Sequence, residues 1–281
     1  MTNVRFYIKV LQRLMKRLSS WWPVRWWFRS GYFAKGLLYG LIGLFAGQSA
    51  LGGPVRILGA EGVFVQLARQ PFGTLLIVAL SVGLAGYAVW RLIQAVADPE
   101  HDRSLDGKAI LQRLGYGISG MSYGSIAYGS LEFLLETWPQ SDDTVEDVTV
   151  QVMAFPLGEL LIEAGGVLVI AVGLTYIYGA VTGAYISEFK SSCDSRLKQL
   201  AVWLGQVGYI ARGIAFTVIG GGLIKAGFFS SSASAGGLEK ALEMLQSETY
   251  EASGLSLIAI GFLAYGLYTF FATFYRRFRQ G

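Results

Sequence analysis

The six residues Gly31-Tyr32-Phe33-Ala34-Lys35-Gly36 open the first long apolar run of this chain, and their pattern returns twice. The later copies are Gly115-Tyr116-Gly117-Ile118-Ser119-Gly120 and Gly208-Tyr209-Ile210-Ala211-Arg212-Gly213. A single Gly-Tyr-x-x-x-Gly motif carries little information, but three copies in register indicate that one unit has been triplicated. Three residues after each second glycine stands an aromatic residue: Tyr39, Tyr123 and Phe216.

Composition places the chain in a membrane. Of its 281 residues, 53% are hydrophobic and only 15% are charged, and the mean hydropathy is +0.46. A soluble domain carries about 25% charged residues. The chain has one cysteine, Cys193, and one histidine, His101, which excludes an intrachain disulfide and an ordinary zinc site. The basic first 30 residues do not resemble a signal peptide.

Six apolar runs follow, each near the roughly 20 residues that a membrane crossing requires. We therefore predict an all-α polytopic membrane protein with six transmembrane helices. Before the second and fourth runs, an acidic residue precedes a proline by ten residues, as in Glu61 and Pro71 or Glu146 and Pro156. Residues 59–70 and 236–246 are predicted to form short amphipathic helices. Their apolar sides would hold Val63 and Leu67 in the first, and Leu238, Leu242 and Leu245 in the second. The runs span approximately residues 31–51, 73–95, 114–135, 157–181, 206–227 and 254–275.

Three features together resemble a known family. They are the Gly-Tyr-x-x-[Lys/Arg]-Gly opening, the Pro71-Phe72-Gly73 start of the second run, and the Gly-Leu-x-x-Tyr pattern from Gly83 to Tyr87. The chain resembles the bacterial membrane proteins called "domain of unknown function 1206" over about residues 29–275, in three tandem copies. Copy two departs from the pattern, with Ser119 where a base is usual. The resemblance implies two membrane helices per repeat, and it implies no activity.

The repeats suggest the arrangement of the domains. We expect a leader at residues 1–30, followed by repeats at 31–98, 113–188 and 205–276. Units of one orientation pack most simply about a pseudo-threefold axis along the membrane normal. Because close helix contact in lipid relies on small residues, we expect the three odd-numbered helices to meet there through Gly36, Gly120 and Gly213. The even-numbered helices and the amphipathic loops would then be outer.

The distribution of Lys and Arg residues predicts the orientation of the chain in the membrane. Seventeen of the 23 Lys and Arg residues fall in the leader, the 91–113 and 188–198 turns and the tail, and four fall on the other side. The positive-inside rule then places both termini in the cytoplasm of a bacterial inner membrane; a thylakoid membrane is the alternative for a photosynthetic source. The leader, with its bases, Trp21, Trp22, Trp26 and Trp27, is predicted to lie in the membrane interface as an amphipathic helix. The alternative is that its charges only fix the topology.

Two triads are candidates for an anion or lipid-headgroup site. Tyr32, Lys35 and Tyr39 share one helix face, and Tyr209, Arg212 and Phe216 repeat them. A charge inside a membrane helix suggests function. The alternative is that both bases snorkel to the headgroups or make structural pairs.

Four carboxylates form the second candidate site. Glu132 and Glu136 end the third run, and Glu159 and Glu163 begin the fourth. Crowded at one membrane face, they could bind a cation or carry a proton. The alternative is a solvated acidic rim that enforces topology.

We find no catalytic residue set, metal-ligand spacing or cofactor motif, and expect no enzyme, no metal and no cofactor. The main hypothesis is a non-catalytic scaffold or subunit that organises lipids or a larger membrane complex. Its partners would be membrane lipids, anionic headgroups among them, and protein subunits, with no nucleic acid. The alternative is a channel or transporter for a small ion or solute.

Overall fold

The computed structural model describes residues 22–53, 59–97, 107–135, 144–183, 185, 195–246 and 251–275. Within these ranges the chain is all-α and contains no strand. Six long helices coincide with the six predicted apolar runs. They are α2 (Trp22–Ala50), α4 (Gly73–Ala97), α5 (Gly107–Leu134), α7 (Gly158–Thr182), α8 (Ser195–Phe228) and α10 (Glu251–Tyr275).

Four of the long helices are long and apolar enough to cross a membrane: α4, α7, α8 and α10. The other two are as long but less apolar. Helix α2 has Arg25 and Arg29 in its first turns, and α5 interrupts its apolar residues with serines such as Ser122 and Ser125. Length and composition therefore indicate a membrane protein.

Short helices connect the long ones within each repeat. They are α3 (Gly59–Ala68), α6 (Thr144–Met153) and α9 (Leu238–Gln246), the last preceded by a 3-10 turn, η2 (Ser232–Ser234). The predicted apolar face of α3 is confirmed, because Val63 and Leu67 are buried, and so is Leu242 in α9.

The turns after α3 and α6 have the same geometry. Phe72 and Leu157 both adopt a left-handed backbone, with φ of 62° and 67°. The next residue must be glycine in each case, since a Cβ on Gly73 or Gly158 would overlap the carbonyl oxygen of Leu67 or Val152. Repeats one and two thus enter their second long helix through the same turn.

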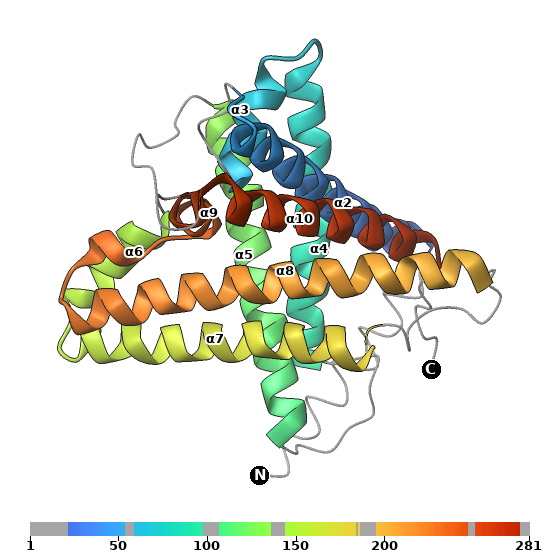
Figure 1. Cartoon of the computed structure of the whole chain (residues 1–281). Coiled ribbons are helices and arrows are strands. Elements are labelled where there is room, and N and C mark those ends of the chain that lie inside the picture. Colours follow the sequence, from blue (N-terminus) through green and yellow to red (C-terminus); the bar gives the residue numbers. More distant parts are fainter. Residues whose placement is uncertain are drawn as a thin grey trace.

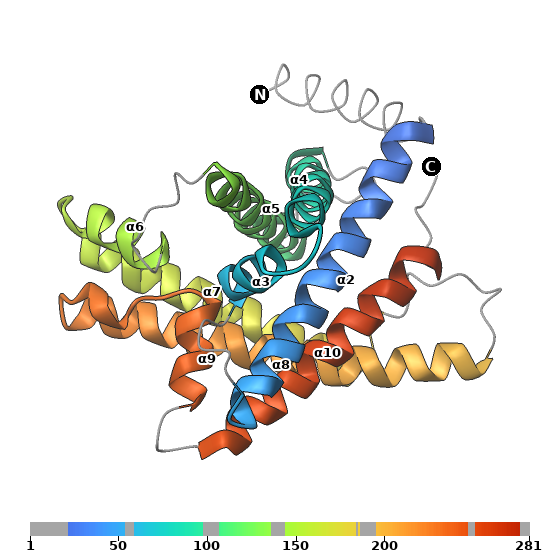
Figure 2. The same cartoon turned by 90° about the horizontal axis from the view of Figure 1, so that it is seen from above.

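The long helices pack in an open ring, in the order α5, α4, α2, α10, α8, α7. The most extensive contacts join different repeats: α7 with α8, α2 with α10, and α4 with α5. Figure 1 shows the α4/α5 pair upright and the α7/α8 pair crossing it, and Figure 2 shows α2 running beside α10. Within repeats, α2 packs on α4 and α8 on α10, whereas the described parts of α5 and α7 in repeat two make no extensive contact.

The expectation that the odd-numbered helices meet through their second glycines is wrong. Gly36 lies against the backbone of Gly266 in α10, Gly120 against Leu92 and Ala88 in α4, and Gly213 against Gly173 and Ile177 in α7. Each odd helix therefore packs on an even helix of another repeat. Of the even helices, α10 and α4 are not outer either, because they bury 61% and 50% of their most apolar windows, against 33% for α8, whereas α7 buries only 17% and is outer as expected.

Part of the predicted leader belongs to the first long helix. Helix α2 begins at Trp22, so the expected boundary at residue 30 falls inside it. The Trp27 indole donates a hydrogen bond to the carbonyl of Val82 in α4 (3.2 Å), and Phe28 packs on Trp90 with ring centroids 4.8 Å apart. These aromatic residues pack against repeat one. Residues 1–21 lie outside the described residues.

Candidate functional site

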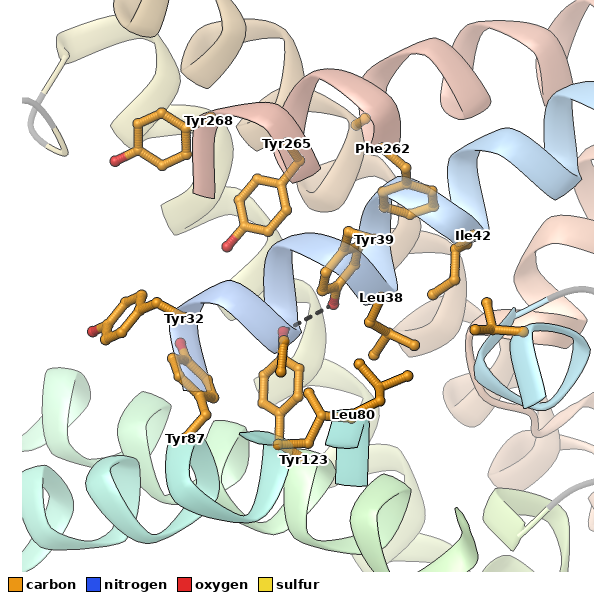
Figure 3. Close-up of a cluster of buried hydrophobic side chains, with 14 of the residues drawn as sticks. Tyr32, Leu38, Tyr39, Ile42, Leu80, Tyr87, Tyr123, Phe262, Tyr265 and Tyr268 are labelled. Atoms are coloured by element: carbon orange, nitrogen blue, oxygen red, sulfur yellow. Dashed lines mark hydrogen bonds between the residues drawn. The ribbon is translucent and has the colours of Figure 1, made fainter. Parts of the chain in front are cut away.

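All six long helices contribute side chains to one buried cluster, which we call the tyrosine cluster. Figure 3 shows several of its members turned toward one another from different helices. Helix α2 supplies Lys35 and Tyr39, and α8 supplies Arg212 and Phe216. The other four long helices each supply one tyrosine: Tyr87 from α4, Tyr123 from α5, Tyr176 from α7 and Tyr265 from α10.

The tyrosine rings fill the space where the helices meet. Tyr87 and Tyr123 meet edge to face at 4.7 Å, and Tyr39 and Tyr265 do so at 5.0 Å. The Tyr123 hydroxyl donates to that of Tyr39 at 3.2 Å, the dashed line in Figure 3. Edge-to-face pairs at such distances are each worth about 0.5–1.5 kcal/mol beyond the burial of their area.

Lys35 is enclosed by the cluster, with 3% of its surface exposed. Its ammonium donates to the Tyr87 hydroxyl at 2.8 Å. It also lies over three rings, those of Tyr87 at 4.6 Å, Tyr265 at 5.2 Å and Tyr123 at 5.3 Å. One hydroxyl and several ring faces thus surround this charge.

Arg212 occupies the corresponding place in repeat three and is also 3% exposed. Its Nη1 donates to the Tyr265 hydroxyl at 2.6 Å. The guanidinium carbon lies over Tyr176 at 4.6 Å and Tyr265 at 4.7 Å, with Tyr39 and Phe216 slightly farther at 4.9 and 5.4 Å. Its Nε is buried and has no hydrogen-bond partner in the described part of the chain.

Neither base snorkels, so that part of the sequence-based alternative is wrong. Lys35 lies near the middle of α2, and Arg212 lies near the middle of the 34-residue α8. Both side chains turn into the protein and pair with tyrosines instead. A buried charge costs several kcal/mol unless it is compensated, and a desolvated cation–π contact returns about 2 kcal/mol.

Arg91 extends the site along α4. Its Nε donates to the Tyr87 hydroxyl at 2.7 Å, and its Nη1 donates to Gln94 at 3.0 Å. The guanidinium also lies over the ring of Tyr116, 4.9 Å away. The sequence analysis counted Arg91 only as a base of the following turn. Its position one turn after Tyr87, on the same helix face, could have revealed it.

Repeats one and three build the same local structure. Lys35 bonds Tyr87 and Arg212 bonds Tyr265, each time within one repeat. A Cβ on Gly31 would lie 2.7 Å from the Tyr87 backbone nitrogen, and one on Gly208 would lie 2.6 Å from the Tyr265 Cα. The motif glycine therefore allows the odd helix to approach the tyrosine of its own repeat.

Repeat two lacks this arrangement. It has Ser119 where the other repeats have a base. A Cβ on its Gly115 would meet nothing within 4 Å, and Tyr176 contacts Arg212 of repeat three. The missing base and the open Gly115 accompany the lack of extensive contact between α5 and α7.

The two motif tyrosines lie at the edge of the cluster. Tyr32 is buried and meets Tyr87 edge to face at 5.1 Å. Tyr209 is half-buried and stacks on Tyr185 at 4.7 Å. The Tyr185 hydroxyl donates to the carbonyl of Val202 at 2.6 Å, and burial raises the pKa of Tyr185 to about 12.

The three candidate carboxylates that the structure describes lie on two helices, Glu132 on α5 and Glu159 and Glu163 on α7. Glu132 on α5 is half-buried near Tyr128, and Glu136 lies outside the described residues. On α7, which makes no extensive contact with α5, Glu159 is exposed and accepts a hydrogen bond from Ser230 at 2.5 Å. Glu163 is half-buried beside Gly227. No three His, Cys, Asp or Glu side chains of the described chain could hold a metal ion.

Comparison with known proteins identifies the repeat. The model of the family described as "Domain of Unknown Function (DUF1206)" matches residues 30–98, 114–183 and 207–276. A Bacillus subtilis (strain 168) protein named as the uncharacterized protein YxxB is 29% identical over 272 residues, which cover 95% of this chain and 96% of that protein. No solved structure matches the chain.

Proposed function

We propose that this chain, which belongs to the Domain of Unknown Function (DUF1206) family, is a non-catalytic scaffold or subunit that organises lipids or a larger membrane complex. It would cross a bacterial inner membrane six times, with both termini in the cytoplasm. It would carry no cofactor, and its partners would be lipids and apolar protein subunits.

One observation carries this proposal: the centre of the helix ring is filled by side chains. The rings of Tyr39, Tyr87, Tyr123 and Tyr265 lie 4.7–5.0 Å from their nearest partners, and two cations are bonded to their hydroxyls. Rings packed at these distances leave little room for a passing solute. A packed core is what a structural membrane protein needs.

Equivalent contacts support six crossings and a pseudo-threefold relation between the repeats. The second motif glycine of each repeat packs against a backbone carbonyl of an even helix, that of Gly266, Ala88 or Gly173. Gly266 and Ala88 each follow a cluster tyrosine, whereas Gly173 lies three residues before Tyr176. Each repeat thus contacts the next repeat in the same way, and units related in this manner all point in the same direction relative to the membrane. In that arrangement α2 and α5 would cross the membrane with the four more apolar helices.

The surface of α7 supports a role in contacts with lipid or with other apolar helices. Only 17% of its most apolar window is buried, the lowest share among the candidate membrane helices. A continuous apolar face of this kind requires lipid or another apolar helix beside it. Its exposed residues include Leu160, Leu161, Val167, Leu168, Leu174 and Val181.

The buried cations favour a second candidate function, a channel or transporter for a small anion. Charged residues inside membrane segments often mark ion pathways, and Lys35 and Arg212 share the Tyr265 ring. In this alternative the tyrosine rings would have to move apart during transport.

Affinity isolation in mild detergent, paired with flux measurements in liposomes, separates the two candidates. A scaffold is expected to retain protein subunits or a fixed set of lipids, and to leave liposomes as tight as empty ones. Isolation of the chain alone, together with a salt-selective anion flux, would contradict the scaffold and support the transporter.

A further inference from the structure

We infer that Arg212 binds the phosphate of an anionic lipid, which approaches the edge of the tyrosine cluster between α5 and α7 and displaces the Tyr176 ring that covers the guanidinium. This deepens the proposed function, since it names the class of lipid and its site, and it rests on the membrane location proposed above. The shared chemistry is a phosphate oxyanion held by a buried guanidinium.

The surroundings of Arg212 leave the site positively charged. The contacts described for Arg212 are one hydroxyl and four aromatic rings, and none is a carboxylate. Lys35 lies over the same Tyr265 ring from another helix, 5.2 Å from its centre. Two positive charges therefore flank one phenol, and the field between them favours an anion.

The hydrogen-bond donors of Arg212 also favour an anionic ligand. Arg212 uses Nη1 for Tyr265, while its Nε is buried without a hydrogen-bond partner among the described residues. A guanidinium presents its donors in a planar fork that matches the oxygens of a phosphate. A phosphate at Nε would supply the acceptor that this buried donor lacks, at a saving of about 1–3 kcal/mol.

The route to Arg212 is the opening in the helix ring. Helices α5 and α7 make no extensive contact with each other, unlike the equivalent pairs α2/α4 and α8/α10. A Cβ on Gly115 of α5 would meet nothing within 4 Å, whereas its equivalents Gly31 and Gly208 lie against a tyrosine backbone. Tyr176, which covers one face of Arg212, is half-exposed on α7.

The exposed surfaces of the two helices fit an amphiphile better than a free ion. Helix α5 exposes Leu114 and Met121, and α7 exposes Leu168 and Leu174. Acyl chains can lie along such apolar surfaces while the headgroup reaches the buried cation. A free anion would gain nothing from them.

The test uses the purified full-length chain in neutral detergent, with bound lipids counted by native mass spectrometry. Phosphatidylglycerol is expected to be retained in preference to phosphatidylcholine. Arg212→Gln should weaken this retention about tenfold or more, as expected for the loss of a charge-assisted hydrogen bond. Lys225→Gln is the matched control, because Lys225 is exposed on the same helix.

A second pair of variants tests the route without touching either base. Gly115→Trp places an indole in the open space beside α5 and should reduce phosphatidylglycerol retention. Gly221→Trp on α8 also has nothing within 4 Å of its Cβ and should not. This pair of variants tests whether the lipid reaches Arg212 by this route even if Arg212→Gln fails to fold.

Three results would overturn the inference. They are equal retention of both lipids, unchanged retention in a folded Arg212→Gln chain, and unchanged retention in Gly115→Trp. Displacement of phosphatidylglycerol by equimolar inorganic phosphate would also overturn it, because the ligand would then be a free anion. Co-purified subunits would still support the scaffold in each case, so the two proposals fail separately.

Discussion

At the scale of single residues, tyrosine hydroxyls decide whether two cations can be buried in this protein. A hydroxyl accepts a hydrogen bond from the charged group, while its ring offers a negative face to the same cation. Lys35 and Arg212 both use a tyrosine of their own repeat in this way. Removing only the hydroxyl therefore separates the hydrogen bond from the ring contact.

Tyr265→Phe is predicted to destabilise the protein by about 1.5–3 kcal/mol, the usual value of a hydrogen bond to a charged group. The ring stays over Arg212, but Nη1 loses the acceptor that lies 2.6 Å away. Thermal unfolding in detergent measures the loss. Tyr268→Phe, one turn later on α10, is the control, because its hydroxyl donates to the neutral carbonyl of Tyr185 over a long distance of 3.5 Å. Equal midpoints for the two variants would contradict the prediction.

The sequence predicted which residues of a motif share a face, but not what they contact. Tyr32, Lys35 and Tyr39 are spaced for one side of a helix, and all three are buried together. Their partners lie on α4, α5 and α10, far away in the chain. Helix periodicity contains no information about which helix faces that side. For the same reason Arg91 was assigned to a turn, although it belongs to the cluster.

At the scale of helices, the positions of the elements were predicted well and their neighbours were not. The predicted apolar runs end within two residues of the C-terminal ends of the six long helices. The odd helices begin several residues before their predicted runs, in less apolar sequence. Small residues indicated close packing, and this is confirmed. The small residues of each odd helix contact an even helix of another repeat. Which helix becomes the partner depends on the shapes of both helix surfaces.

The contact between α2 and α10 provides a matched pair of glycines. A Cβ on Gly43 would lie 2.6 Å from the Leu263 backbone nitrogen, so Gly43→Ala must push the helices apart at about 1–3 kcal/mol. Gly40, one turn earlier, has nothing within 4 Å of its Cβ. Gly40→Ala is expected to be neutral or to stabilise by about 0.5–1 kcal/mol, since alanine favours a helix. Unfolding midpoints measure both, and a Gly43→Ala midpoint at or above that of Gly40→Ala would contradict this packing.

At the scale of the whole molecule, a chain with three copies of one unit forms a ring that stays open at one place. Repeats one and three each close their two helices around a base and a tyrosine. Repeat two has a serine in place of the base, and its helices α5 and α7 make no extensive contact. The copy that departs most in sequence is thus the copy that departs in structure. Triplication explains the common packing, and divergence of one copy explains the opening.

The orientation of this ring in the membrane gives the last prediction. In the predicted topology of six crossings, 17 of the 23 bases would lie on the side that also holds the 188–198 turn, which includes Cys193, the chain's single cysteine. A membrane-impermeant thiol reagent should therefore label Cys193 in inside-out vesicles and leave it unmodified in intact cells. Cys193 itself lies outside the described residues.

A second site makes the test independent of the reactivity of one thiol. Ser231 is exposed after α8, at the opposite end of that helix from the 188–198 turn. In a Cys193→Ser background, Ser231→Cys should be labelled in intact cells and protected in inside-out vesicles. If α8 crosses the membrane once, the two sites must give opposite results. Labelling of both sites from one side would refute the crossing of α8, and the reversed pattern would refute the orientation while leaving the crossing in place.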